Sequence, residues 1–278
     1  MFASFPRACQ QLLDIILANS QSVNVLLHNR GGRSFVTVDL PGMSSFSTLG
    51  VQLADCNNDG ALDIIFTNNN AANQVLVNGG NGDFHSISVL PGGTTSSSGI
   101  AIGDFNADGL LDAYIGNDQL LINAGSASYI PSDLPATGLG AWNFALADVN
   151  NDGALDCTFT DYSYNAKLLV NDGSGGFTLV TLAASGGNAI TTAMADLNGD
   201  GFVDVLVGTA GYNTIHLNNG GAGTAFTSSM LPGVASTQSG VFTHAFGIVD
   251  VDGDGDLDII ADGELLTVTS PSLLTPCF

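Results

Sequence analysis

A nine-residue motif recurs along the chain, and one copy reads Asp196-Leu197-Asn198-Gly199-Asp200-Gly201-Phe202-Val203-Asp204. Four further copies cover Asp55–Asp63, Asp104–Asp112, Asp148–Asp156 and Asp250–Asp258. Every copy has Asp or Asn at positions 1, 3, 5 and 9 and glycine at position 6. Side chains at positions 1, 3 and 5 converge if the backbone curls, and glycine permits the sharp turn because it has no Cβ. We therefore expect five similar loops.

The five loops predict metal binding, because carboxylate and amide oxygens are the ligands that a hard cation prefers. Ca²⁺ is the best candidate, with one ion in each loop and about five ions in all. Each loop holds at least three carboxylates, which would repel one another without a cation. The expected side-chain ligands are Asp55, Asn57, Asp59, Asp63, Asp104, Asn106, Asp108, Asp112, Asp148, Asn150, Asp152, Asp156, Asp196, Asn198, Asp200, Asp204, Asp250, Asp252, Asp254 and Asp258.

An EF-hand is the alternative calcium motif, and the sequence argues against it. That loop needs a bidentate glutamate at position 12 and flanking helices. Here the flanks have the pattern of strands, and position 12 is occupied by side chains that cannot bind a cation: Phe66, Ile115, Phe159, Val207 and Ala261.

The negative charge of the chain is concentrated in these loops. The net charge is −22, yet 45% of the 278 residues are hydrophobic, which excludes a disordered acidic chain. The loops hold three acidic residues each, except the last, which has five, so together they carry 17 of the 26. With only four basic residues in the chain, we predict that nucleic acid is not a partner.

The N-terminal region contains no clear targeting signal. No apolar run approaches the roughly 20 residues of a transmembrane helix, so none is predicted. The apolar run from Leu12 to Leu17 is short and contains Asp14, so no signal peptide is visible. Loops of this kind nevertheless suit extracellular calcium concentrations. We expect an extracellular or cell-surface location and an N-terminally truncated chain.

The loops mark a longer repeat. The aspartates at position 9, called the closing aspartates, fall at residues 14, 63, 112, 156, 204 and 258, a mean interval of about 49 residues. In the first repeat Pro6, Ala8 and Gln10 replace the other ligands, so that loop should not bind metal. A period of this size predicts a propeller or a solenoid.

Each repeat predicts four short strands. Apolar segments such as Ile100–Gly103 precede each loop, and others such as Asp204–Val207 follow it. A third strand, an Asn-Gly hairpin turn and a fourth strand such as Phe177–Leu182 complete the unit. We predict an all-β chain, a β-propeller of about six four-stranded blades in one domain covering residues 1–278. The repeats span approximately 1–46, 47–98, 99–140, 141–187, 188–240 and 241–278.

The ends of the chain leave the blade count open. Phe2–Phe5 is a poor first strand, Glu264–Thr269 supplies a third strand of the last repeat, and Leu273–Phe278 supplies a fourth. A six-blade fragment of a seven-bladed ring is the alternative. A disulfide between Cys9 and Cys277 would close a ring, whereas free thiols at Cys9, Cys56, Cys157 and Cys277 are the other interpretation.

The loop, the apolar strand after it, and the turn that precedes an aromatic together resemble the FG-GAP/VCBS repeat, which builds integrin-alpha-like β-propellers. Phe246-Gly247 keeps the FG of that name. The resemblance implies a further calcium ligand, the backbone carbonyl at position 7, from Ala61, Leu110, Ala154, Phe202 and Asp256. It also implies extracellular adhesion or recognition of carbohydrate or protein, on the face opposite the calcium loops.

The connections on that opposite face supply candidate ligand residues. Tyr162 and Tyr164 lie between Asp161 and Asn165, and Tyr212 precedes Asn213. Aromatic rings beside amides suit sugar binding, whereas ordinary turn chemistry is the alternative. Trp142 lies near this face, although its spacing favours core packing.

The sequence contains no evident catalytic set. The histidines, His28, His85, His216 and His244, occupy non-equivalent repeat positions, and nothing in the sequence pairs them with a nucleophile. We therefore predict no catalytic residues and a binding module rather than an enzyme. A polysaccharide-active enzyme on this scaffold and a structural module of a larger cell-surface protein are the alternatives.

Overall fold

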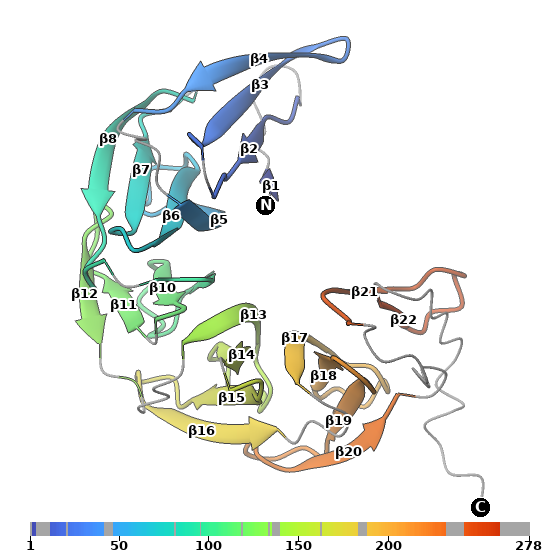
Figure 1. Cartoon of the computed structure of the whole chain (residues 1–278). Helices are drawn as coiled ribbons and strands as arrows, with labels where there is room; N and C mark the ends of the chain where they lie inside the picture. The colour runs from blue at the N-terminus through green and yellow to red at the C-terminus, as the bar shows by residue number, and fades with distance from the viewer. Residues whose placement is uncertain are drawn as a thin grey trace, which may run out of the picture. The chain divides into compact units, whose positions relative to one another are not determined.

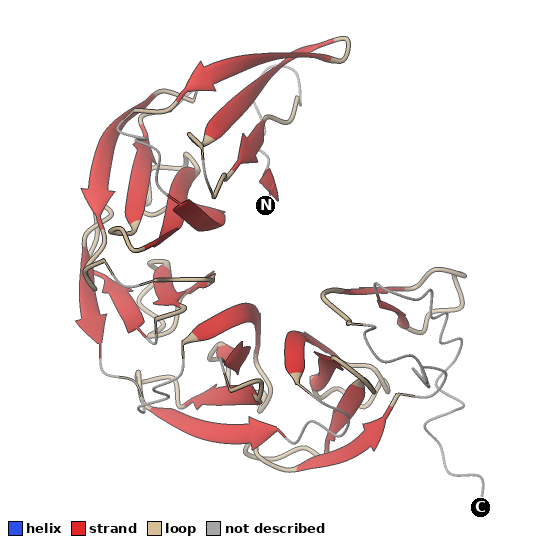
Figure 2. Ribbon diagram, viewed as in Figure 1, coloured by secondary structure: helices blue, strands red, loops and turns tan. Residues whose placement is uncertain are grey.

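The computed structural model describes residues 2–3, 12–20, 22–41, 47–80, 82–94, 96–117, 119–132, 134, 140–161, 163–182, 188–231 and 242–261. The regular elements in these ranges are all strands, which confirms the predicted all-β fold (Figure 2). Within the same ranges no helix is long and apolar enough to span a membrane. The predictions for Pro6, Ala8, Gln10, Cys9, Cys277, Tyr162, Glu264–Thr269 and Leu273–Phe278 lie outside the described residues.

The chain divides into two compact units, Met1–Ala141 and Trp142–Phe278. The prediction of one domain stays a prediction. Unit 1 contains three sheets of four strands whose spatial order follows the chain (Figure 1). These strands are β1 (Phe2–Ala3), β2 (Ile15–Leu17), β3 (Val25–Gly31), β4 (Ser34–Asp39), β5 (Ser47–Ala54), β6 (Asp63–Asn69), β7 (Gln74–Asn78), β8 (Phe84–Val89), β9 (Ile100–Gly103), β10 (Asp112–Ile115), β11 (Gln119–Asn123) and β12 (Tyr129–Ser132).

Unit 2 repeats the same plan. Two four-stranded sheets and a described two-stranded sheet contain β13 (Ala141–Ala147, which begins at the last residue of unit 1), β14 (Asp156–Asp161), β15 (Ala166–Asn171), β16 (Phe177–Leu182), β17 (Ala189–Ala195), β18 (Asp204–Thr209), β19 (Thr214–Asn218), β20 (Phe226–Met230), β21 (Phe246–Val249) and β22 (Asp258–Ala261). Strands β9 and β16 have the predicted bounds, and Phe2–Ala3 is the described part of the strand predicted at Phe2–Phe5.

The core lies between the faces of successive sheets. In β18, Val205 and Val207 join the apolar cluster shared with the sheet before, while Leu206 joins the cluster shared with the sheet after. Strand β6 divides its residues in the same way between two clusters. Successive strand side chains point to opposite faces, so a strand that is covered on both sides is apolar throughout. The second strand of each sheet is therefore its most buried element.

The closing aspartates begin the second strands and join each loop to the third strand. Asp204 Oδ2 accepts the N–H of Leu197 at 2.9 Å, and Oδ1 accepts the N–H of Asn218 at 2.8 Å. Asp63, Asp112 and Asp156 accept the same two bonds, and Asp258 accepts the first of them. All five are at most 5% exposed. Each buried carboxylate is thus paired with backbone donors, as a buried charge must be.

An asparagine that ends each third strand completes this arrangement. The Nδ2 of Asn218 donates to Val203 O at 3.1 Å in its own loop and to Val149 O at 2.6 Å in the loop of the preceding sheet. Asn123 makes the corresponding pair of bonds to Leu111 and Cys56. The sequence predicted these asparagines only as turn residues. The structure gives Asn123 and Asn218 a second role, because their side-chain amides join neighbouring loops.

The first repeat keeps the closing aspartate although its other loop ligands are replaced. Asp14 Oδ1 accepts the N–H of Asn29 at 2.8 Å, as in the other sheets. The Nδ1 of His28 also lies 3.0 Å from Asp14 Oδ1, and both side chains are buried. Anchoring by the closing aspartate is therefore present where no complete set of loop ligands exists.

The closing aspartates lead to a stability prediction. Asp204→Asn removes one acceptor and points an amide at a backbone donor, so we expect a loss of about 2–3 kcal/mol in the free energy of unfolding. Asp200→Asn is the matched control, because Asp200 is exposed and asparagine keeps the Oδ1 acceptor that Phe202 N–H uses. Denaturant unfolding in excess chelator measures both variants. Equal losses would contradict the anchoring role.

His216 leads to a pH prediction. Its Nδ1 lies 2.7 Å from Ser228 Oγ, its Nε2 is buried without a partner among the described residues, and burial lowers its pKa to about 4. The unfolded imidazole titrates near 6.5, so the stability contributed by neutral His216 is complete above that pH and is lost as the pH falls toward 4. We expect the wild type to lose about 2 kcal/mol more than His216→Leu between pH 7.5 and 5 in denaturant unfolding. The same loss of unfolding free energy in the wild type and in His216→Leu would disprove this prediction.

Candidate functional site

The five loops connect the first and second strands of their sheets. Neighbouring strands in these sheets are antiparallel, so the loops share an edge with the turns between the third and fourth strands. The connections between the second and third strands lie at the opposite edge. Each predicted metal ligand is therefore placed on one edge of its sheet, and Tyr164 and Tyr212 are placed on the other.

The first aspartate of each loop organises the turn. In the loop before β18, Asp196 Oδ1 accepts the N–H of Asp200 at 3.2 Å, and Oδ2 accepts the N–H of Gly201 at 2.9 Å. The bond to the position 6 glycine recurs in every loop, at 2.7–3.0 Å. That glycine has φ between 84° and 95°, a left-handed conformation that side chains disfavour. The predicted role of the glycine is confirmed.

Positions 3 and 5 face one another across the turn. In the first four loops the Oδ1 of Asn57, Asn106, Asn150 or Asn198 accepts the N–H of the aspartate at position 5, and its Nδ2 donates to that carboxylate at 2.7–3.0 Å. The position 5 carboxylate also accepts the N–H of position 7. These contacts hold positions 3, 5 and 7 of the first four loops close together.

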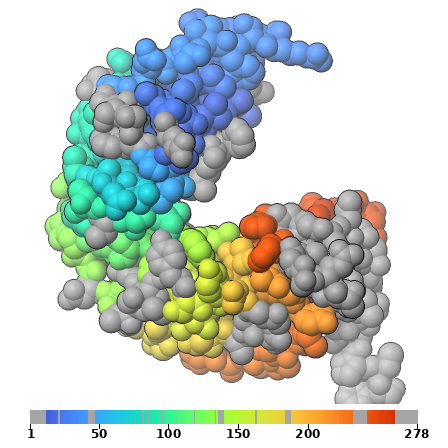
Figure 3. All heavy atoms as spheres, in the orientation of Figure 1, coloured from blue at the N-terminus to red at the C-terminus, as the bar shows by residue number. Residues whose placement is uncertain are grey.

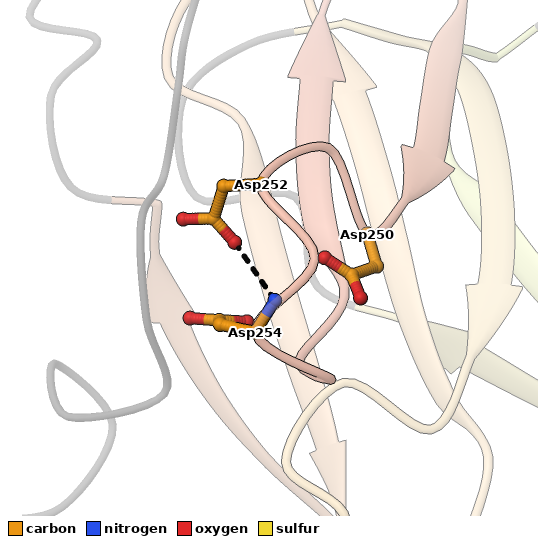
Figure 4. Close-up of side chains that lie close together, drawn as sticks. All are labelled: Asp250, Asp252 and Asp254. Atoms are coloured by element: carbon orange, nitrogen blue, oxygen red, sulfur yellow. Dashed lines mark hydrogen bonds between the residues drawn. The ribbon is translucent and has the colours of Figure 1, made fainter.

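The last loop differs because it contains no amide. Asp252 takes the place of the asparagine, and the carboxylates of Asp250, Asp252 and Asp254 offer oxygens within 4.8 Å of one another (Figure 4). The N–H of Asp254 donates to Asp252 Oδ1 at 3.2 Å. The segment 242–261, red in Figure 3, reaches the surface of unit 2, and Asp252 and Asp254 are exposed. Three anions this close repel one another unless a cation lies among them.

The electrostatics of the closing aspartates also fit a cation. Burial raises the pKa of Asp156 and of Asp204 to about 6, although their backbone donors lower it. Burial likewise raises the pKa of Asp63 and of Asp112. A raised folded pKa means that stability is lost as the pH rises through about 6 and the group ionises. A nearby cation reverses this effect, because it favours the charged form.

The carbonyls at position 7 come from Ala61, Leu110, Ala154, Phe202 and Asp256, all next to the position 6 glycine. Together the side chains and these carbonyls form an all-oxygen donor set, which suits Ca²⁺ or Mg²⁺ rather than a soft metal. The chemistry of the residues present therefore fits the expected ion.

The predicted ligand tyrosines lie in different turns. Tyr164 is 43% exposed in the turn after β14, and Tyr212 is 38% exposed in the turn after β18. Trp142 is only partly buried, and its ring centroid lies 6.2 Å from that of Tyr164. Trp142 thus fits both alternatives in part. Its ring is partly buried, as core packing requires, and it lies near Tyr164, which we place on the ligand face.

One histidine contact was not visible in the sequence. His216 lies beside the hydroxyl of Ser228, because β19 and β20 pair antiparallel and place the two residues opposite one another. The two are 12 residues apart, so sequence spacing alone did not indicate the contact. Within the described residues the Nε2 of His216 has no partner, so no carboxylate orients this imidazole. Cys56 and Cys157 are free and buried.

Comparison with solved structures supports a propeller fold. A structure described as the recognition of non-reducing terminal N-acetylglucosamine by an Agrocybe aegerita lectin has a TM-score of 0.63 and 21% identity, covering 94% of this chain and 74% of the lectin. BBS1N, solved in complex with ARL6DN, has a TM-score of 0.57 and 11% identity, covering 97% and 79%. The V. cholerae biofilm matrix protein Bap1 has a TM-score of 0.51 and 15% identity, covering 80% and 38%.

Comparison of the sequence with the curated proteins gives no match. The FG-GAP-like repeat family, in contrast, matches four times, at residues 11–66, 55–115, 148–207 and 196–261. These matches together cover well over half of the chain and include all five loops. The sheets described above are therefore blades of a β-propeller fold, and the chain belongs to the FG-GAP-like repeat family.

Proposed function

We propose that this chain is a calcium-stabilised, extracellular β-propeller module that recognises carbohydrate or protein. Calcium occupies the five loops, and the ligand binds at the opposite edge of the blades. The observation that carries the proposal is the repetition of one oxygen-rich loop geometry in five blades. A single acidic loop would be weak support, whereas the same hydrogen bonds at five sites indicate one shared requirement.

The calcium ions serve stability rather than catalysis. Each loop offers several oxygen donors from one short segment, which leaves little room for a substrate in the coordination shell. At a concentration ten times Kd, one ion adds about 1.4 kcal/mol and five ions add about 7 kcal/mol. That sum is comparable to the net stability of a whole domain, about 5–15 kcal/mol. The ions therefore stabilise the folded blades.

The recognition role is supported by what similar folds do. The Agrocybe aegerita lectin recognises terminal N-acetylglucosamine, and BBS1N forms a complex with the protein ARL6DN. Carbohydrate and protein are thus both reasonable ligand classes for this chain. Its exposed tyrosines, Tyr164 and Tyr212, lie at the edge where we place the ligand.

A polysaccharide-active enzyme is the second candidate, and the His216–Ser228 contact is the observation that favours it. A serine nucleophile needs a base that a third group orients. The Nε2 of His216 has no such partner in the described part of the chain. Binding without catalysis is therefore the better proposal.

Calcium binding is tested by calorimetry and thermal melting. We expect about five ions per chain and a large fall in Tm on chelation. Asp250→Ala should reduce the number of ions by one, because it removes the residue that organises the last loop. Asp39→Ala is the matched control, since it removes an exposed carboxylate from β4, outside the loops. Absence of binding by the wild type would refute the calcium proposal.

Recognition is tested on a glycan array and by pull-down from extracellular protein fractions, both in saturating Ca²⁺. We expect specific retention of one ligand class that competes with free ligand. N-acetylglucosamine-terminated glycans belong on the array because of the fold similarity described above. Blank results in both experiments, with a folded and calcium-loaded protein, would refute the recognition role.

A further inference from the structure

The connection between the second and third strands follows one design in three blades, and the blade of β13–β16 departs from it. In three blades the residue at the end of the second strand, Asn19, Asn68 or Thr209, donates its N–H to the side chain of an asparagine four or five residues later, at 2.8–3.1 Å. Its own side chain donates to the carbonyl just before that asparagine, at 2.7–2.9 Å. These turns are closed by their own hydrogen bonds.

Asp161 occupies the same place in the blade of β13–β16, where it cannot act as the other residues do. A carboxylate has no donor for the turn carbonyl. Asp161 Oδ1 accepts the N–H of Asn165 at 3.0 Å, but Oδ2 has no hydrogen-bond partner among the described residues, and the residue is 0% exposed. An unpaired buried charge is costly, and asparagine or threonine would avoid that cost. The turn itself gives no reason for the carboxylate.

The rest of the turn departs from the repeated design as well. Asn24, Asn73 and Asn213 donate their amides to hydroxyl groups farther along the chain, at 2.9–3.0 Å. Asn165 donates instead to Ser163 O, at 3.3 Å and at the surface. Tyr164 has φ of 60°, which is rare for a bulky residue, and its exposed ring lies at 54° to the ring of Trp142. Strained residues of this kind often mark binding sites.

We propose that Asp161, Tyr164 and Asn165, together with Trp142, form a carbohydrate subsite. The inference rests on the proposed recognition function and names its location. Asp161 Oδ2 accepts a hydrogen bond from a sugar hydroxyl, and the Asn165 amide donates to or accepts from a neighbouring hydroxyl. The ring of Tyr164 packs against the apolar face of the sugar. Because Asp161 is buried, the turn shifts on binding, and the strained Tyr164 is the residue that relaxes.

A neutral sugar fits this set better than a basic peptide. Sugar hydroxyls both donate and accept hydrogen bonds, so they satisfy a carboxylate and an amide at the same time. A lysine ammonium only donates, and it would leave the donor capacity of the Asn165 amide unused. Asp161, Tyr164 and Asn165 also lie close together in the sequence, and a backbone N–H of Asn165 donates to Asp161.

The single tryptophan of the chain provides the test. Trp142 is the only tryptophan and lies beside Tyr164, so its fluorescence reports on this turn. We expect titration with one of chitobiose, lactose or mannobiose to change the emission with saturation. Asp161→Asn, which copies the residue at Asn68, should weaken that response at least about tenfold without lowering Tm. Tyr164→Ala should also weaken it.

Thr178→Ala is the matched control and should leave the affinity unchanged, because Thr178 is exposed on β16 near the loop edge of the same blade. Glycan binding on the array with no emission change, and with full affinity in Asp161→Asn, would overturn this site and leave the recognition role standing. No glycan binding at all would overturn the sugar class. An emission response to tetralysine but to no sugar would also overturn the sugar class. A large fall in the Tm of Asp161→Asn would show that the carboxylate stabilises the fold and would overturn its role in binding.

Discussion

The carboxylate of the closing aspartate is the interaction on which each blade depends. It is buried at the start of the second strand and accepts one backbone N–H from the loop and another from the end of the third strand. Leu197 and Asn218, which are 21 residues apart, are thereby joined through one side chain. Burying the charge is costly, and the two donors offset that cost only in part, because burial still raises the pKa of Asp204 to about 6.

A bound cation would interact with the same carboxylates that accept the anchoring hydrogen bonds. Anchoring and metal binding therefore share side chains but are separate interactions. The first repeat separates them, because Asp14 keeps the bond to Asn29 while Pro6, Ala8 and Gln10 stand where the other ligands belong. Where the ligands are complete, the first aspartate of the loop already orders the turn through the position 6 glycine. These hydrogen bonds order the loop without an ion, so the Ca²⁺ that we propose would bind a turn that is already formed.

Because the blades repeat one design, equivalent positions in different blades can be compared directly. Most differences between equivalent positions keep the hydrogen bonding, as when Thr209 replaces Asn68 and still donates to its turn carbonyl. Asp161 does not, since it puts an acceptor where the other blades have a donor. Such a departure is informative because the fold shows, three times over, how the same turn closes without it. The loops at one edge are alike from blade to blade, whereas the connections at the opposite edge differ between blades.

The sequence by itself determined the all-β fold, the blade period and the five loops, because these depend on contacts within about 15 residues, where spacing and turn chemistry act directly. The tertiary structure decided what depends on distant partners. Asn218 reaches Val149 and Asn123 reaches Cys56 across 69 and 67 residues, so their role as links between blades was not visible as a motif. Strand register likewise placed Ser228 beside His216, and burial left Asp161 with an unpaired oxygen. Local spacing cannot reveal burial, because burial is a property of everything that packs around a residue.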